Sequence, residues 1–90
     1  MARALEANPD IVKIEIGGHT DSVGADSVNM RLSRARAKSV RNFLIAQGVS
    51  SRRLSTKGYG ESRPLDTNGT EAGRYQNRRV EFVVLETSGR

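Results

Sequence analysis

The chain contains no cysteine and only one histidine among its 90 residues. The absence of thiols excludes disulfide scaffolds, thiol catalysis, iron–sulfur clusters and cysteine-ligated zinc. A lone imidazole, His19, cannot form a closed metal site, so no metal ion is expected. His19 lies too close along one loop to Asp21 and Ser22 for the three residues to form a recognisable catalytic triad. The glycines at 17, 18 and 24 do not match a phosphate-binding loop, and we predict no cofactor and no enzymatic activity.

Long apolar runs are also absent. The first ten residues match neither a signal peptide nor a membrane span, so we expect no direct insertion of this segment into a membrane. Aromatic residues are few: Phe43, Tyr59, Tyr75 and Phe82. Because Phe43 and Phe82 fall in apolar patterns, we expect both in the core, which leaves too few aromatic side chains for a base-stacking platform.

The length and composition of the chain are those of one small globular domain covering residues 1–90. Apolar residues make up 36% of the sequence, or about 46% when the nine glycines are counted with them. This share is normal for a globular protein, so extensive disorder is not expected. A chain of this size is near the lower limit of what a single hydrophobic core stabilises.

Positive charge is concentrated in the middle of the sequence. Fifteen Lys and Arg residues stand against ten Asp and Glu, and the segment 31–60 holds eight cations and no acid. Two interpretations stay open on the charge pattern alone. The cations either form the solvated face of a helix or bind an anionic partner such as a nucleic acid through the 31–57 run.

Sequence periodicity predicts an α/β domain. Residues 1–8 are typical of a short helix that ends before Pro9, and residues 11–16 alternate as a strand that ends at Gly17 and Gly18. Residues 26–47 form the main helix, with Gly48 as its C-cap. Its apolar face is expected to hold Val28, Leu32, Ala35, Val40, Phe43 and Leu44.

The second half of the chain contains two further strand candidates, a weak one over 53–58 and a clear one over 79–85. Between them, residues 60–77 are typical of a long surface loop with one short helix near 70–75. Two strands joined by a helix should be parallel. We therefore predict a two-layer α/β (α+β) sandwich, with helices on one face of a small mixed sheet.

Arg36 lies in line with the apolar positions of the main helix, four residues after Leu32 and four before Val40. A guanidinium at such a position either extends to the edge of the helix or meets a carboxylate. The second possibility makes Arg36 a candidate anion-binding residue.

Four sequence blocks in this order, spread over residues 9–86, resemble the OmpA-like domain. The first is Gly18-His19-Thr20-Asp21-Ser22-Val23-Gly24. The second sets Asn29, Leu32, Ser33, Arg36, Ala37, Val40 and Leu44 at the family's spacing. The third is Gly58-Tyr59-Gly60-Glu61-Ser62-Arg63-Pro64, and the fourth is Asn77-Arg78-Arg79-Val80-Glu81.

The resemblance implies non-catalytic, non-covalent binding of peptidoglycan through the diaminopimelate of its stem peptide. In this family such a domain anchors an outer-membrane or other envelope protein to the cell wall from the periplasm of Gram-negative bacteria. Asp21 would accept hydrogen bonds from the ligand's ammonium, and Arg36 would hold its carboxylate. Thr20, Asn29, Leu32 and Arg78 match further positions of the same cleft. Asn77 is instead expected to hold a loop, and Arg79 to point from the last strand toward solvent.

The same resemblance implies that the chain begins inside the family's first helix and lacks its first strand. One edge of the sheet, formed by the strand at 79–85, would then be unpaired, which predicts a homodimer through this edge. Besides peptidoglycan binding, a nucleic-acid-binding domain and a structural, dimerising fragment stay open as alternatives.

Overall fold

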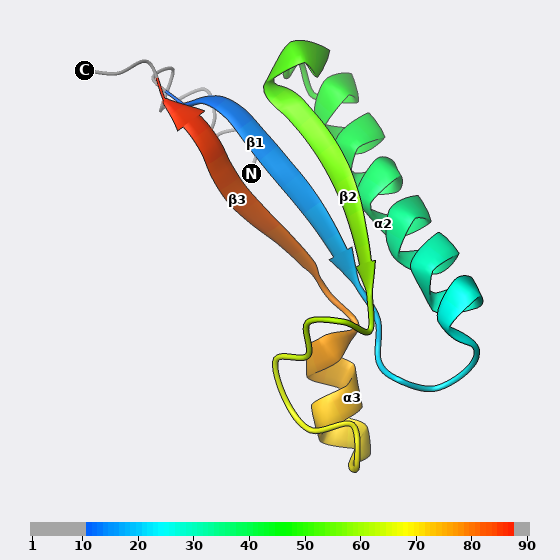
Figure 1. Cartoon of the computed structure of the whole chain (residues 1–90). Coiled ribbons are helices and arrows are strands. Elements are labelled where there is room, and N and C mark those ends of the chain that lie inside the picture. Colours follow the sequence, from blue (N-terminus) through cyan, green and yellow to red (C-terminus); the bar gives the residue numbers. More distant parts are fainter. Residues whose placement is uncertain (1–10, 88–90) are drawn as a thin grey trace.

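The computed structural model describes residues 11–87, which form three strands and two α-helices (Figure 1). The helix expected over residues 1–8 lies outside the described residues. In chain order the elements are β1 (Ile11–His19), α2 (Asp26–Ala46), the short 3-10 helix η1 (Ser51–Arg53), β2 (Leu54–Gly60), α3 (Glu71–Asn77) and β3 (Val80–Thr87). The strands form one mixed sheet in the order β2-β1-β3, with β1 parallel to β2 and antiparallel to β3. The predicted mixed sheet is therefore confirmed.

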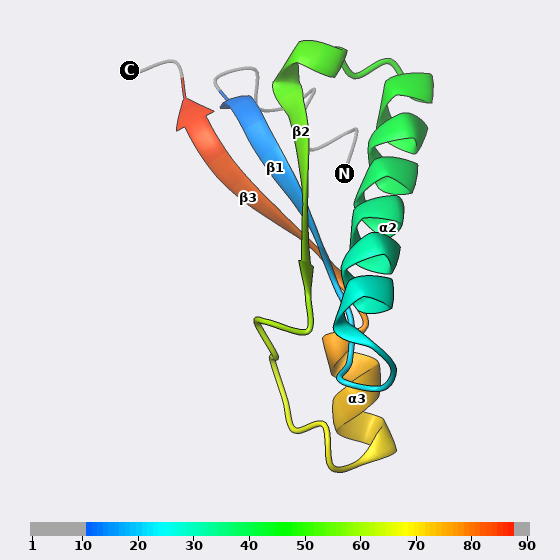
Figure 2. The same ribbon diagram turned by 45° about the vertical axis from the view of Figure 1, so that its right-hand side comes forward.

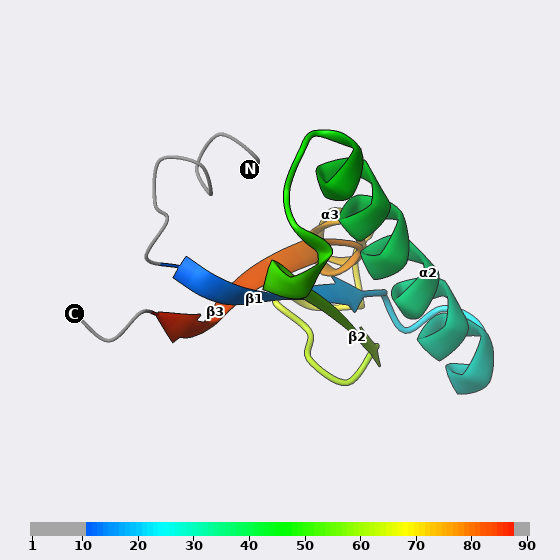
Figure 3. The same cartoon turned by 90° about the horizontal axis from the view of Figure 1, so that it is seen from above.

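One face of the sheet is covered by α2. The helix runs along β2 and β1, and β3 lies farthest from it (Figure 2). The short α3 lies beyond the end of the sheet where β1 and β2 finish and β3 begins (Figure 1). Viewed from above, α2 forms a second layer on one side of the sheet (Figure 3).

Close backbone contact brings α2 against the sheet. A Cβ atom on Gly18 would lie 1.9 Å from the Ser33 carbonyl oxygen, and one on Gly58 would lie 2.6 Å from the Ser33 hydroxyl. That hydroxyl accepts a hydrogen bond from the Gly60 N–H (3.0 Å) and donates one to the Met30 carbonyl (2.8 Å). The N-terminal half of α2 is thereby fixed beside the ends of β1 and β2.

The apolar face predicted for the main helix is partly wrong. The buried residues of α2 are Asn29, Ser33, Ala37 and Leu44. In contrast, Phe43 is 62% exposed and Leu32 41%. The glycines of the sheet draw the helix backbone so close that only small side chains fit between them, which turns the larger apolar side chains to the flanks. Phe82, also expected in the core, is 36% exposed because α2 does not cover β3 fully.

The hydrophobic core lies between α2 and the first two strands. Its buried members are Ile14, Ile16, Ala37, Leu44, Val49 and Leu54. Gly48 ends the helix as predicted, with φ +101°. The Gly48 N–H bonds the Ile45 carbonyl (3.0 Å) and the Val49 N–H bonds the Leu44 carbonyl (3.1 Å), which is a Schellman motif. This turn places Val49 in the core.

The element boundaries differ from the sequence prediction by a few residues. The first strand does not end at the glycine pair but continues to His19, because Gly17 and Gly18 pair with β2 and β3 on both sides. The short helix predicted near 70–75 is observed as α3, where the Thr70 hydroxyl caps the Gly73 N–H (3.0 Å).

Candidate functional site

The loop that follows β1 carries Asp21, which is 8% exposed, and buried polar side chains hold this loop. The Thr20 N–H bonds the Gly60 carbonyl (2.8 Å), and the Thr20 hydroxyl donates to the Asp21 carbonyl (2.9 Å). The Asn29 amide donates to the carbonyls of Asp21 (3.3 Å) and Val23 (3.1 Å). Thr20 and Asn29 are both almost completely buried, so they shape the loop and expose little surface to a ligand.

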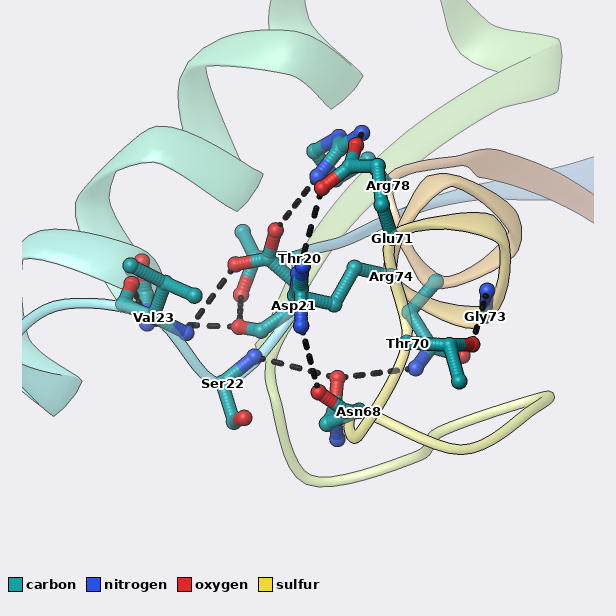
Figure 4. A network of polar contacts seen from close by, with 12 residues as sticks. Thr20, Asp21, Ser22, Val23, Asn68, Thr70, Glu71, Gly73, Arg74 and Arg78 are labelled. Atoms are coloured by element: carbon teal, nitrogen blue, oxygen red, sulfur yellow. Dashed lines mark hydrogen bonds and ion pairs between the residues drawn. The ribbon is translucent and has the colours of Figure 1, made fainter.

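The Asp21 carboxylate makes an ion pair with Arg78, the first residue after α3 (Figure 4). Arg78 Nη1 lies 2.7 Å from Asp21 Oδ2, and Arg78 Nη2 lies 2.5 Å from Glu71 Oε1. The other carboxylate oxygen of Asp21 accepts a hydrogen bond from the Val23 N–H (3.0 Å). The hydrogen bond from Arg78 lowers the pKa of Asp21, and burial opposes this effect. Asp21 is therefore held as an anion at neutral pH.

Arg36 enters the same end of the molecule from α2. Its guanidinium is half-buried, and Nη1 donates to the carbonyl of His19, the last residue of β1 (3.1 Å). Within the described residues, Arg36 and Asp21 form no ion pair with each other. Leu32 lies one turn earlier on the helix, with its side chain exposed. The structure thus brings Asp21 and Arg78 into contact and places Arg36 at the end of the strand from which Asp21 emerges.

Asn77 is fully buried and organises the loop between β2 and α3, as predicted. Its side-chain oxygen accepts hydrogen bonds from the N–H groups of Leu65 (2.7 Å) and Asp66 (2.9 Å). Its amide donates to the Asp66 carbonyl and to Asn68 Oδ1, both at 2.9 Å.

Asn68, which no sequence pattern singled out, connects this loop to the site. Asn68 Oδ1 also accepts a hydrogen bond from the Ser22 N–H (3.2 Å), next to Asp21 (Figure 4). Arg74 Nη1 donates to the Asn68 carbonyl (3.0 Å), and Arg74 Nε lies 3.2 Å from Glu71 Oε2. Residue spacing carries no signal for the contact between Asn68 and Ser22, because it joins a surface loop to a turn 46 residues away.

The expectation that Arg79 points to solvent is wrong. Arg79 Nε lies 2.6 Å from Glu81 Oε1, and Nη2 donates to the Arg63 carbonyl (2.9 Å). The side chain is only 16% exposed. The loop before α3 passes close enough to the start of β3 for its carbonyl to capture this guanidinium.

His19 lies on the sheet face opposite α2, where it stacks on Tyr59. The two ring centroids are 5.0 Å apart and the rings are nearly parallel. The guanidinium of Arg63 lies 4.3 Å from the centroid of the Tyr59 ring, and the Tyr59 hydroxyl donates to the Glu15 carboxylate. Burial, followed by the positive charge of Arg79, lowers the pKa of His19. The imidazole is therefore neutral at physiological pH and serves in packing, while its backbone carbonyl holds Arg36.

The described surface includes two hollows with different linings. One, of about 300 Å³, is lined by Asp26, Met30, Tyr59, Gly60, Glu61 and Ser62, next to the end of β2. There a hydrogen bond with Asp26 raises the pKa of the Glu61 carboxyl. The other, of about 430 Å³, is lined by Val12, Ser50, Arg52 and Arg53 and lies near the start of β1, at the other end of the sheet from Asp21.

Over residues 11–87 the structure shows no cluster of three or more His, Asp or Glu side chains able to hold a metal ion. In the same range, neither helix combines the length and the apolar character needed to cross a membrane.

Solved structures with this architecture come from bacterial envelope proteins. The peptidoglycan-associated lipoprotein of Burkholderia pseudomallei is 33% identical and superposes with a TM-score of 0.84, over 91% of this chain and 69% of that one. The cell wall anchor of the type VI secretion system of Pseudomonas aeruginosa is 31% identical, with a TM-score of 0.81 over 94% of this chain and 61% of that one. The fold is thus that of a domain found in cell-wall-associated proteins.

The chain belongs to the OmpA family, whose family model matches residues 1–78. Outer membrane porin F of Pseudomonas fluorescens is 53% identical over 71 residues, which are 79% of this chain and 22% of the porin. The peptidoglycan-binding protein ArfA of Mycobacterium tuberculosis is 43% identical over 84 residues, 93% of this chain and 26% of ArfA. The chain therefore spans about a quarter of the length of these relatives.

Proposed function

We propose that this domain binds peptidoglycan without catalysis, through the diaminopimelate of the stem peptide. It would thereby anchor an envelope protein to the cell wall from the periplasmic side of the outer membrane. Membership of the OmpA family and the similarity to the peptidoglycan-binding protein ArfA support the wall as the ligand. The observation that carries the finer assignment is the placement of an ionised Asp21 and the Arg36 guanidinium around the end of β1.

The chemistry of the ligand suits these two charges. The free end of diaminopimelate carries an ammonium and a carboxylate on the same carbon. A carboxylate has about four acceptor positions, so Asp21 can accept from an ammonium while its contacts to Arg78 and Val23 persist. Arg36 is tied to the His19 carbonyl through one nitrogen, and a guanidinium has five N–H donors, enough to hold a carboxylate as well.

Arg78 has a supporting role in this proposal. By lowering the pKa of Asp21 it keeps the acceptor charged, and its second contact, to Glu71, fixes its orientation. A few charge-assisted hydrogen bonds give modest affinity for one stem peptide. The many copies of the peptide in a wall polymer compensate through avidity when several domains are anchored together.

Titration with purified muropeptides tests the proposal. A charge-assisted hydrogen bond is worth about 1.5–3 kcal/mol, so D21A and R36A should each weaken the binding of a diaminopimelate muropeptide by about ten- to a hundredfold. The matched controls are D66A and R31A, which remove an exposed aspartate and an exposed arginine outside the proposed site. Circular dichroism verifies that each variant is folded.

Ligand selectivity separates the roles of the two charges. A lysine-type muropeptide keeps the side-chain amine but lacks the carboxylate beside it, so the unaltered domain should bind it more weakly. The R36A variant should bind both muropeptides with similar affinity, because it has lost the group that distinguishes them. If R36A still preferred the diaminopimelate form as strongly as the unaltered domain, the carboxylate would lie elsewhere.

A further inference from the structure

Four cations of α2 lie on one side of the helix and form a row. Arg31, Arg34, Lys38 and Arg41 are spaced by three, four and three residues, which places their side chains along one line. We call this row the basic stripe. From Arg31 to Arg41 it extends about 15 Å at 1.5 Å per residue.

The basic stripe lies on the β2 flank of α2. The Arg34 stem packs at Gly58 of β2, where an added Cβ would lie 2.5 Å from Arg34 Cγ. Arg41 Nε donates to the Leu54 carbonyl (3.2 Å) and Nη2 to the Ser51 carbonyl (3.4 Å). Arg31, Arg34 and Lys38 are exposed, so their charges are available to a partner.

No acid neutralises the basic stripe within residues 11–87. The Lys and Arg ion pairs of these residues involve Arg74, Arg78 and Arg79, each with a glutamate or Asp21. Arg74, Arg78 and Arg79 are thus paired with acids, whereas the cations of the stripe have no acidic partner among these residues. Like charges at these helical spacings repel, so a bound polyanion would relieve an unfavourable interaction.

We infer that the basic stripe is a second contact with the wall polymer, for carboxylates of stem peptides that neighbour the one held at Asp21. This inference rests on the proposed function. The stripe begins two residues after Asn29, which bonds the Asp21 loop, and runs away from that loop along α2 (Figure 1). A row of separate charges suits a linear polymer with repeated carboxylates, and the contact adds affinity only when the ligand is longer than one stem peptide.

The surroundings of the stripe favour this partner over a nucleic acid or a bilayer. The segment 31–41 that carries the stripe contains no aromatic residue, and the Tyr59 ring already stacks on His19 and contacts Arg63. The outward positions of α2 next to the stripe hold Ala35, Ser39 and Asn42, which are small or polar, while the exposed Leu32 and Phe43 lie toward the opposite flank of the helix. Side chains of this kind do not insert into a membrane interface as bulky apolar ones do.

The test compares intact sacculi with the monomeric diaminopimelate muropeptide over a range of salt concentrations. Exposed ion pairs are each worth up to about fivefold in affinity, so K38E should bind sacculi about two- to fivefold more weakly and R31E/K38E about tenfold more weakly. Both variants should show a shallower salt dependence. K13E applies the same charge change on β1, at an exposed residue outside the stripe, and should bind sacculi within twofold of the unaltered domain.

Muropeptide binding separates this inference from the proposed function. All three variants should bind the monomeric muropeptide normally, because it is too short to reach the stripe. Unchanged sacculus binding by R31E/K38E, or an equal loss in K13E, would overturn the role of the stripe and leave the Asp21 site untouched. So would tighter binding of the unaltered domain to duplex DNA or phosphatidylglycerol vesicles than to sacculi at the same salt. Failure of the unaltered domain to bind the muropeptide would instead refute the proposed function.

Discussion

Replacing Asn77 with alanine should weaken ligand binding although Asn77 does not touch the proposed site. Its side chain makes four hydrogen bonds within the 65–68 segment. One of them orients Asn68, whose oxygen also holds the Ser22 N–H beside Asp21. Without Asn77, the Asn68 side chain should become less well ordered, and with it the Asp21 loop that it holds.

The size of the effect follows from these contacts. A neutral hydrogen bond contributes about 0.5–1.5 kcal/mol net, which gives about 2–6 kcal/mol for four bonds. Leu65 and Asp66 are exposed, so their freed backbone groups can bind water, and the cost should fall near the lower end. We expect N77A to lower the free energy of unfolding by about 2–3 kcal/mol and to weaken muropeptide binding severalfold.

Denaturant unfolding and muropeptide titration measure the two effects. The matched control is N42A, which removes an exposed asparagine from α2 and should leave both quantities almost unchanged. N77D is a second variant. It keeps the acceptor for the two N–H groups but loses both donors, and should also weaken binding. If N77A were destabilised as expected but bound muropeptide normally, the connection through Asn68 to Asp21 would be refuted.

Three further predictions concern charge, packing and assembly. Because Arg78 lowers the pKa of Asp21 in the folded state, the ion pair should stabilise the domain above pH about 4. The difference in Tm between the unaltered domain and D21N should then be constant from pH 7 to 5 and shrink on further acidification, and a constant difference at pH 2 would contradict this. G18A should destabilise by about 3 kcal/mol or more in urea unfolding, because its Cβ would meet the α2 backbone, whereas G69A should have little effect; equal stability of the two would refute the close-contact argument. In residues 11–87, β3 pairs only with β1, and its Val83 is 46% exposed. We therefore expect sedimentation to show concentration-dependent dimers, which V83K should reduce. A monomer at all concentrations would show that this sheet edge is covered.

Much of the fold follows from local signals in the sequence. The periodicity of the main helix, its terminating Gly48 and the alternation in the strands all report short-range geometry. The buried face of α2 could not be predicted in the same way. Hydropathy favoured Leu32 and Phe43, whereas the face is selected by the glycines of two strands, which admit Ser33 and Ala37.

The candidate site, too, could be predicted from the sequence only in part. The family resemblance pointed to Asp21, Arg36 and Arg78 as members of one cleft, and whether they bind a ligand stays a prediction. The direct pairing of Asp21 with Arg78 joins residues 57 positions apart, and no periodic pattern encodes such a contact. The capture of Arg79 by Glu81 and the Arg63 carbonyl depends likewise on the path of a loop.

The central position of β1 has a consequence for how the domain responds to its ligand. The same strand supplies Ile14 and Ile16 to the core, pairs on both sides, and ends at the carbonyl that holds Arg36. A central, doubly paired strand exchanges its amide hydrogens only through the largest opening reactions of a protein. The end of the strand that holds Arg36 is therefore already ordered before a ligand arrives, and little conformational entropy is lost there on binding. Mechanical load transmitted through the ligand would pass directly into the most stable part of the domain.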